Sequence, residues 1–466
     1  MIEAGDQGLR EDLEWLMDRN IVQNVSTSTW PLPLSVLEDA LSGARKSNLS
    51  PSDVHALLSV KKYIERQKVT VFGVAAKLNA KALPQTDFSS TAKGKGVGAV
   101  YVRGGGESIA GRVQINYLID PLTSKQSKIN LEGSYIAAAG LGQVLYAGQI
   151  SHWWGPGQHG SLIWGNSATA IPGIGLQRGK YVPFESPWLS WIGPWGYDLF
   201  VGQMAHDTAV PGVRVLNMRG FFRPVDGLEI GVSRFIQWGG SGRRNGFGAV
   251  WDALTGNSND LGKSADPGNE LAGIDIRYRF SLMGNPVVLY SQLAGEDEAG
   301  MLPSKHILQI GAQFKHIVGS SRVQWTLEGA DTTVRRFFGL SDGQTGVAYR
   351  HSIYRNGLYH DGLPIAHFLG GSGRVYSASL SIAPRDYNYY SKFSVRIFHA
   401  EPNVINEPVN QAFPRAGKLW GSEVSYGWQY GAAQLKLVAQ LVKAQKGSVG
   451  NAFNVGLSVN YPLAIM

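Results

Sequence analysis

The sequence predicts an all-β transmembrane barrel of about 18 antiparallel strands, preceded by a small α-helical bundle. From Val69 onward, apolar and polar residues alternate, as in strands with one dry face and one wet face. The alternating segments are roughly 10 residues long, which is the length that a tilted strand needs to cross a bilayer. Short and long connections between them also alternate, an asymmetry typical of outer-membrane barrels.

The composition favours one large barrel over two or three soluble domains. The 466 residues include 59 glycines, and 11% are aromatic. Only 17% are charged, against an average of about 25%. No run approaches the roughly 18 apolar residues of a membrane helix, so a membrane-spanning chain would have to cross as strands. Cysteine is absent, which excludes a disulfide framework and a cysteine nucleophile.

The start of the chain and its net charge bear on where the protein is located and what it binds. Met1 to Asp6 contains neither a basic region nor an apolar core. We therefore expect an exported form to have lost its leader peptide before this numbering begins. The formal net charge of +8 suits an anionic partner such as an acidic polysaccharide or lipid phosphate. The chain has no run of basic residues longer than a pair such as Arg243-Arg244, so we expect no nucleic-acid partner.

Residues 1–68 are predicted to form a helical bundle that plugs or supports the barrel. Apolar residues at helical spacing give short helical faces near 9–16 and 36–41. Ser50-Pro51-Ser52-Asp53 supplies an N-cap, a proline at the first helical position and early negative charge for a third helix. A plain helical lead-in to the barrel is the alternative.

The barrel itself is predicted over residues 69–466. Its strands are expected near 69–79, 96–104, 109–119, 129–139, 143–151, 186–192, 196–205, 213–223, 228–238, 274–280, 285–294, 306–316, 322–331, 374–383, 391–400, 420–430, 432–444 and 452–462. Residues 346–355 could form an extra strand.

Connection lengths assign the two ends of the predicted barrel. If the first strand runs away from the helical unit, tight turns such as Gly104-Gly105-Gly106 and Gly193-Pro194 all fall at the end where the helices lie. Because outer-membrane barrels have short periplasmic turns, we expect the helical unit on the periplasmic side. The long connections then form the outer end: 80–95, 152–185, 239–270, 332–373 and 401–419.

A series of aromatic- and glycine-rich motifs runs along nearly the whole chain. They are Trp15-Leu16-Met17-Asp18-Arg19, Ser28-Thr29-Trp30-Pro31-Leu32, Trp153-Trp154-Gly155-Pro156-Gly157, Gly160-Ser161-Leu162-Ile163, Trp191-Ile192-Gly193-Pro194-Trp195, Gln237-Trp238-Gly239-Gly240, Trp251-Asp252, Pro267-Gly268-Asn269-Glu270-Leu271-Ala272-Gly273, Gly295-Glu296-Asp297-Glu298-Ala299-Gly300 and Asn410-Gln411-Ala412-Phe413-Pro414. In this order they resemble the Wzi family, outer-membrane lectins of capsule assembly in Gram-negative bacteria. The resemblance implies an 18-stranded barrel that is closed by a periplasmic helical bundle and holds capsular polysaccharide at the cell surface.

Two of the predicted outer loops carry the residue types that bind acidic sugars. Such a surface needs aromatic faces for the sugar rings, amides and carboxylates for hydroxyls, and arginines that grip uronate carboxylates with two hydrogen bonds. The alternative for each residue is packing that closes the loops over the barrel mouth. We predict a carbohydrate-binding site formed by Trp238, Arg243, Arg244, Trp251, Asp252, Arg350, Tyr354, Arg355, Tyr359 and Asp361.

The stretch from Ser151 to Asn166 is predicted to be a structured loop, because glycine and proline interrupt both strands and helices. Its three tryptophans, Trp153, Trp154 and Trp164, could stack on sugars. We favour burial inside the barrel, because tryptophan is mostly buried in proteins. Tryptophans at 188, 191 and 195, near a predicted strand end, are typical of an aromatic belt at the membrane interface.

We predict a binding protein and no enzyme, cofactor or metal site. The acidic residues 296–298 lack the spacing of a calcium-binding loop, and the histidines form no metal motif. A polysaccharide hydrolase is the enzymatic alternative. It would need two carboxylates about 5 to 10 Å apart, and three acids share one loop: Asp252, Asp266 and Glu270.

The predicted function is that of an outer-membrane lectin that binds acidic capsular polysaccharide or exopolysaccharide through its outer loops and anchors it in capsule assembly. We expect it to be a monomer surrounded by outer-membrane lipid and lipopolysaccharide. The alternative is a porin for small anionic solutes, lined by inward-facing Arg112, Arg277 and Arg279. Long tryptophan-rich loops and an N-terminal plug favour the closed barrel.

Overall fold

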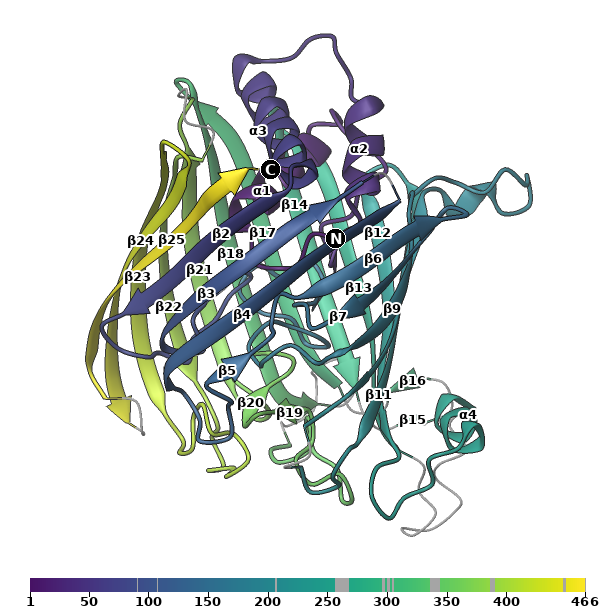
Figure 1. Cartoon of the computed structure of the whole chain (residues 1–466), viewed down its shortest axis with the longest axis vertical. Helices are drawn as coiled ribbons and strands as arrows, with labels where there is room; N and C mark the ends of the chain where they lie inside the picture. The colour runs from purple at the N-terminus through teal and green to yellow at the C-terminus, as the bar shows by residue number, and fades with distance from the viewer. Residues whose placement is uncertain are drawn as a thin grey trace.

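The computed structural model describes residues 1–89, 91–106, 108–205, 208–255, 268–295, 298–299, 302–303, 306–335, 344–385, 390–446 and 450–465. Within these residues the wall is a closed antiparallel barrel (Figure 1). Its first strand, β2, pairs with both β3 and the last strand, β25, and this pairing closes the cylinder. The described wall has 18 strands when β5 and β6, which both pair with β4, are taken as one interrupted strand.

The elements have the following bounds. The wall strands are β2 (Val71–Asn79), β3 (Gly94–Gly105), β4 (Ile109–Pro121), β5 (Ile129–Asn130), β6 (Tyr135–Gly140), β7 (Gln143–Gly148), β9 (Gly173–Arg178), β10 (Trp195–Gln203), β11 (Arg214–Val225), β12 (Leu228–Trp238), β13 (Gly268–Leu282), β14 (Asn285–Gly295), β17 (His306–Val318), β18 (Ser321–Arg335), β21 (Arg374–Ala383), β22 (Lys392–Glu401), β23 (Lys418–Tyr430), β24 (Ala433–Lys446) and β25 (Ala452–Ile465). Two-residue ladders pair β1 (Thr29–Trp30) with β8 (Trp153–Trp154), β15 (Glu298–Ala299) with β16 (Leu302–Pro303), and β19 (Tyr359–His360) with β20 (Leu363–Pro364). The helices are α1 (Gln7–Asp18), α2 (Leu34–Ser42), α3 (Pro51–Lys68), α4 (Phe247–Thr255) and the 3-10 turn η1 (Ser190–Ile192).

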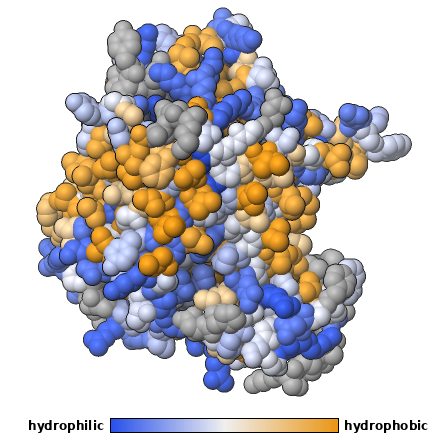
Figure 2. Space-filling view, in the orientation of Figure 1, coloured by the Kyte–Doolittle hydropathy of each residue, from blue (hydrophilic) through white to orange (hydrophobic). Residues whose placement is uncertain are grey.

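Because apolar and polar residues alternate along the strands, the outer face of the wall is mainly apolar and the inner face carries most of the polar side chains. On β4, the outward side chains of Val113, Ile115 and Tyr117 are 49 to 65% exposed, whereas the inward Asn116 and Leu118 are buried. Figure 2 shows hydrophobic side chains gathered over the strands, between more hydrophilic ends. An apolar band between polar ends is the surface expected of a barrel in a bilayer. Among the described residues, none of the helices has the length and apolar character to cross a membrane.

The three predicted N-terminal helices are confirmed, and they lie at one end of the barrel (Figure 1). Asp6 caps α1, because its side chain accepts a hydrogen bond from the backbone N–H of Leu9 at 2.9 Å. Ser50 and Asp53 form the capping box of α3: each side chain accepts from the other residue's backbone N–H, at 3.2 and 2.8 Å. Pro51 occupies the first turn, where its missing N–H costs nothing.

One predicted strand is wrong. Residues 186–192 contain the turn η1, while the wall strand is β9, which pairs with β7 and β10. Glycine hides this strand in the sequence, because Gly175 leaves the space that the ring of Tyr146 fills. The predicted strand 129–139 is interrupted near Gly133, which has φ +93°. The extra strand considered at 346–355 is absent from those residues.

The predicted sorting of connections is confirmed, with two exceptions. The short turns at 141–142, 283–284 and 431–432 lie at the helix end, and the long connections after β12, β18 and β22 lie at the opposite end, which we call the outer end (Figure 1). The exceptions concern the expected outer loop 152–185 and the expected tight turn at Gly193-Pro194, which instead ends the long connection between β9 and β10. Residues 149–172 fold into the barrel, and residues 179–194 extend sideways from the helix end.

Candidate functional site

Residues 149–172 lie inside the barrel, as favoured for the tryptophan-rich loop. Trp153, Trp154 and Trp164 are at most 3% exposed. The ring of Trp164 stacks on His152, with centroids 3.9 Å apart and planes 8° apart. The indole N–H of Trp154 donates to Asp198 on the wall at 3.3 Å. These tryptophans therefore support the structure and offer no open face to a sugar.

Helix α1 is held inside the wall by ion pairs. Both carboxylate oxygens of Asp18 accept from Nη2 of Arg277, and Lys315 lies against Asp18 and Glu14. All of these groups are buried, and buried charges are tolerated when they are paired. Burial alone would raise the pKa of Glu14, but the charges of Lys315 and Arg10 outweigh it and lower that pKa to about 2.

The inward arginines expected to line a porin channel contact the N-terminal region instead. Besides Arg277, Arg279 donates to Asp226 at 2.7 Å and to Asn20 at 3.1 Å. Nη1 of Arg112 donates to Glu3 at 3.2 Å. These side chains anchor the N-terminal region to the wall, and this region and residues 149–172 lie in the interior that an open pore would need.

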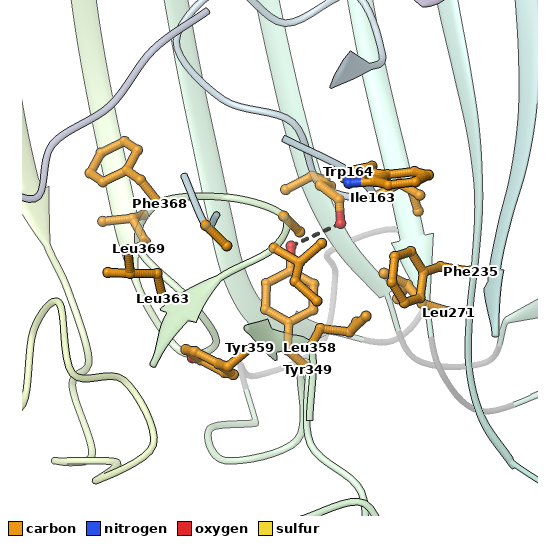
Figure 3. Packing of buried hydrophobic residues seen from close by; sticks show 14 of the residues in the cluster. Ile163, Trp164, Phe235, Leu271, Tyr349, Leu358, Tyr359, Leu363, Phe368 and Leu369 are labelled. Atoms are coloured by element: carbon orange, nitrogen blue, oxygen red, sulfur yellow. Dashed lines mark hydrogen bonds between the residues drawn. The ribbon is translucent and has the colours of Figure 1, made fainter. Parts of the chain in front are cut away.

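At the outer end, a cluster of buried apolar side chains packs residues 149–172 against the loop between β18 and β21. Figure 3 shows Ile163 and Trp164 of residues 149–172 near Phe235 of the wall, above Tyr349 and Leu358 of that loop. The dashed line marks the hydroxyl of Tyr349, which donates to the carbonyl oxygen of Leu162 at 2.9 Å. The loop is therefore fixed to the interior of the barrel.

The first predicted binding loop follows β12 and contains α4, which packs beside β12 and β13 at the outer end (Figure 1). Trp251 on α4 is 55% exposed. Arg244 is also exposed and donates to Asp252 at 3.0 Å, while Arg243 is partly exposed. Trp238, at the end of β12, is buried. The structure thus brings an aromatic face, two arginines and a carboxylate together on α4 and the turn before it.

The second predicted loop divides into buried and exposed residues. Tyr354 and Tyr359 are at most 3% exposed, so their rings support the loop from within. The hydroxyl of Tyr354 donates to the carbonyl oxygen of Gly239 at 3.2 Å, which ties the two predicted loops together. Arg355, in the next position, is exposed.

Arg350 and Asp361 face other neighbours. Arg350 is half exposed, and its Nε lies 2.7 Å from the buried carboxylate of Glu407 in the loop after β22. Asp361 has φ +53° and is partly exposed, and its carbonyl oxygen accepts from Thr123 at 2.5 Å. Arg350 therefore has a structural partner as well as an accessible side.

Sequence reasoning missed the contribution of the loop after β22. Asn403 donates to the carbonyl oxygens of Glu407 and Phe413, at 3.0 and 2.6 Å. Asn410 donates to the carbonyl oxygen of Leu369 at 2.8 Å and so joins this loop to the second predicted loop. The available signal was the density of asparagines, a residue that readily bonds nearby backbone in turns.

Of the acids considered for catalysis or metal binding, two form ion pairs with arginines and three lie outside the described residues. Asp252 pairs with Arg244, and Glu270 pairs with Arg234. Asp266, Glu296 and Asp297 lie outside the described residues. In the part of the chain that the structure describes, no group of three potential ligands is placed to hold a metal ion.

Comparison with known proteins gives three findings. The family described as capsule assembly protein Wzi matches residues 79–442. A Klebsiella pneumoniae protein described as an uncharacterized 55.8 kDa protein in the cps region is 34% identical over 426 residues, which is 91% of this chain and 82% of that protein. A solved Escherichia coli structure superposes with a TM-score of 0.89 and 30% identity, covering 99% of both chains. That protein is described as Wzi, an outer membrane protein involved in group 1 capsule assembly and a carbohydrate-binding β-barrel.

Proposed function

The chain belongs to the Wzi family of capsule assembly proteins, and we propose that it binds acidic capsular polysaccharide or exopolysaccharide through its outer loops and anchors it to the cell surface. It is a β-barrel of the outer membrane. The Escherichia coli barrel that it resembles over almost its whole length binds carbohydrate. The proposal for this chain specifies where the sugar lies and which side chains hold it.

The observation that carries the proposal is the cluster formed by Arg243, Arg244, Trp251 and Asp252 on and before α4. Trp251 is 55% exposed, so the apolar side of a sugar ring can pack on its indole. Arg244, which is held by the neighbouring residue Asp252, can pair with a uronate carboxylate through its planar fork. Asp252 holds Arg244 at 3.0 Å and can accept from sugar hydroxyls. We place Arg355 and the accessible side of Arg350 at the edge of the same surface.

The buried members of the predicted set support this surface. Tyr354 bonds Gly239, and Gln237 donates to the carbonyl oxygen of Gly357 at 3.0 Å. Loops that are already cross-linked lose little conformational freedom when a ligand binds. Trp238, Tyr354 and Tyr359 therefore contribute to affinity by holding the loops in place.

We also propose how the rest of the molecule serves this role. The helical unit at residues 1–68 would face the periplasm, where it closes the barrel through the ion pairs of α1. The apolar band of the wall suits lipid and lipopolysaccharide around a monomer. Binding without cleavage is expected, because Asp252 and Glu270 are each paired with an arginine.

The test is a titration of the purified protein in detergent with fluorescently labelled acidic polysaccharide from the same strain, followed by anisotropy. We expect saturable binding that weakens at least about tenfold, or about 1.4 kcal/mol, in the Trp251→Ala, Arg244→Ala variant. Trp188→Ala is the matched control, because Trp188 is 87% exposed but belongs to the connection between β9 and β10, which lies at the helix end of the barrel. Unchanged binding by the α4 variant would discard this site, and no binding by any form would discard the function.

A further inference from the structure

A cavity of about 600 Å³ lies inside the barrel, away from the outer surface of α4. One side is formed by the N-terminal segment and α3. The other is the inner face of β2, β3 and β4 together with β24 and β25, which are neighbours in the wall (Figure 1). The cavity is partly open and reaches Gln429 and Ala432 at the helix-end rim. We call it the lumen cavity, and its volume falls within the range of about 300 to 1,000 Å³ typical of small-molecule sites.

The first feature of the lumen cavity is a pair of lysines on one cross-strand row. Lys436 on β24 pairs in register with Ser458 on β25, and Ser458 pairs with Lys77 on β2. All three line the cavity. Because neighbouring strands are about 4.8 Å apart, the Cα atoms of the two lysines lie roughly 10 Å apart, with the serine on the strand between them. An anion placed between them would be held from both sides, with the serine hydroxyl beneath it.

The next row toward the helices has small residues between amides. It runs from Gln434 and Asn460 through Ala75 and Ala99 to Asn116. The two alanines leave open space against the wall. Hydrogen bonds fix the amides on either side: Tyr101 donates to Asn460 at 2.8 Å, and Gln114 donates to Asn116 at 2.7 Å. A flat apolar floor between ordered amides suits a sugar ring whose edge carries hydroxyl groups.

The charge of the lining favours an anion. Eight lysines and arginines and five aspartates and glutamates line the cavity. Glu132 pairs with Lys93 and Glu3 with Arg112. Lys392 lies 2.9 Å from Asp12. Lys436 donates to the neutral hydroxyl of Ser89 at 3.4 Å.

We propose that the lumen cavity is a second saccharide site, which takes a uronate-bearing oligosaccharide of one or two sugar units. The carboxylate lies between Lys77 and Lys436, and the ring lies over Ala75 and Ala99 with its hydroxyls on the amides of Gln434 and Asn460. The amide of Asn116 on the other side is buried and donates to Asn130 and Glu132, so it borders the site without binding the sugar. The site is separate from the α4 surface and does not depend on the proposal made for it. It would be reached from the helix end of the barrel.

The test is calorimetric titration of the full-length protein in detergent with three probes: cellobiouronic acid, cellobiose and inorganic phosphate. Cellobiose is the matched probe, because it lacks only the carboxylate function. We expect cellobiouronic acid to bind at least about tenfold more tightly than either of the others. Equal binding of phosphate would overturn a saccharide site, equal binding of cellobiose would overturn the role of the lysines, and no binding would overturn the proposal.

Substitutions of residues that line the lumen cavity test whether cellobiouronic acid binds there. Lys77→Met with Lys436→Met should reduce cellobiouronic acid binding at least about tenfold, while Lys443→Met should not, because Lys443 is exposed on β24 beyond the cavity lining. If the double variant fails to fold, Ala75→Trp fills the floor without changing the charge and should also abolish binding. The Trp251→Ala, Arg244→Ala variant should still bind the disaccharide, which separates this site from the outer one. Unchanged binding in both cavity variants would contradict the proposal.

Discussion

Asp18, the last residue of α1, accepts hydrogen bonds from Arg277 of β13 at 2.7 and 2.8 Å, across a sequence separation of 259 residues. Both side chains are buried. Lys315 of β17 lies against the same carboxylate. Arg277 and Lys315 point into the barrel, where such cations could line a pore, but here they bind the carboxylate of α1.

We expect Asp18→Asn to destabilise the protein by about 3 kcal/mol, because it leaves two buried cations without their anion. The measurement is the thermal unfolding midpoint in detergent. Asp39→Asn is the control, since Asp39 on α2 is 3.7 Å from Lys180, which is 63% exposed. Such exposed pairs contribute at most about 1 kcal/mol. Equal shifts in the two variants would contradict a structural role for the α1 contacts.

We expect the reconstituted wild-type barrel to show no steady ion conductance in planar bilayers. Residues 149–172 and α1 occupy its interior, and the arginines at 112, 277 and 279 are bonded to the N-terminal region or the adjacent turn. Asp18→Asn should produce transient openings as α1 loosens. A stable wild-type conductance comparable to that of open porins would favour the channel interpretation.

Acid should destabilise the outer end through buried histidines. Burial lowers the pKa of His367 to about 3, whereas an unfolded histidine titrates near 6.5. Between these values the unfolded chain binds a proton that the folded chain does not, so stability falls as the pH decreases from 6.5 towards 3. At pH 4.5 this amounts to about 2 to 3 kcal/mol.

His367→Asn tests this pH dependence. The asparagine oxygen can still accept from the backbone N–H of Leu369, which Nδ1 of His367 does at 3.3 Å. We expect the stability lost between pH 7 and pH 4.5, measured by denaturant unfolding, to be smaller in the variant. An unchanged loss would mean that His367 does not titrate in this range.

The pair formed by Arg350 and Glu407 distinguishes a loop support from a sugar ligand. Burial is the main cause that raises the pKa of Glu407, and Arg350 opposes it. We expect Arg350→Gln to speed proteolysis of the outer loops and to weaken polysaccharide binding. The Arg350→Gln, Glu407→Gln double variant should recover most of both properties, because no uncompensated carboxylate remains. If binding stays weak after protease resistance recovers, Arg350 contacts the glycan directly.

The sequence was sufficient to predict the barrel because its two faces meet different solvents. On β13, Ile274, Ile276 and Tyr278 are 43 to 44% exposed, while Asp275 and Arg277 are buried. That alternation is visible in the sequence. β9 was missed because Gly173 and Gly175 carry no side chains that could show the period, whereas residues 186–192 mimic a strand by their aromatic content.

The candidate site could be predicted only to the level of its loops. Exposed Trp251 and buried Trp238 look alike in a sequence, because burial depends on neighbours that the chain brings from far away. The bond between Tyr354 and Gly239 joins residues 115 positions apart, and no local pattern indicates it. Ion pairs such as Arg277 with Asp18 are hidden for the same reason.

Hydroxyl-radical footprinting of the protein with and without its strain's acidic polysaccharide tests the central claim most directly. We predict that saturating polysaccharide protects Trp251 on α4 from oxidation, while Trp188 at the helix end keeps its reactivity as an internal control. If Trp251 is oxidised equally with and without bound polysaccharide, the α4 surface is not the carbohydrate-binding site.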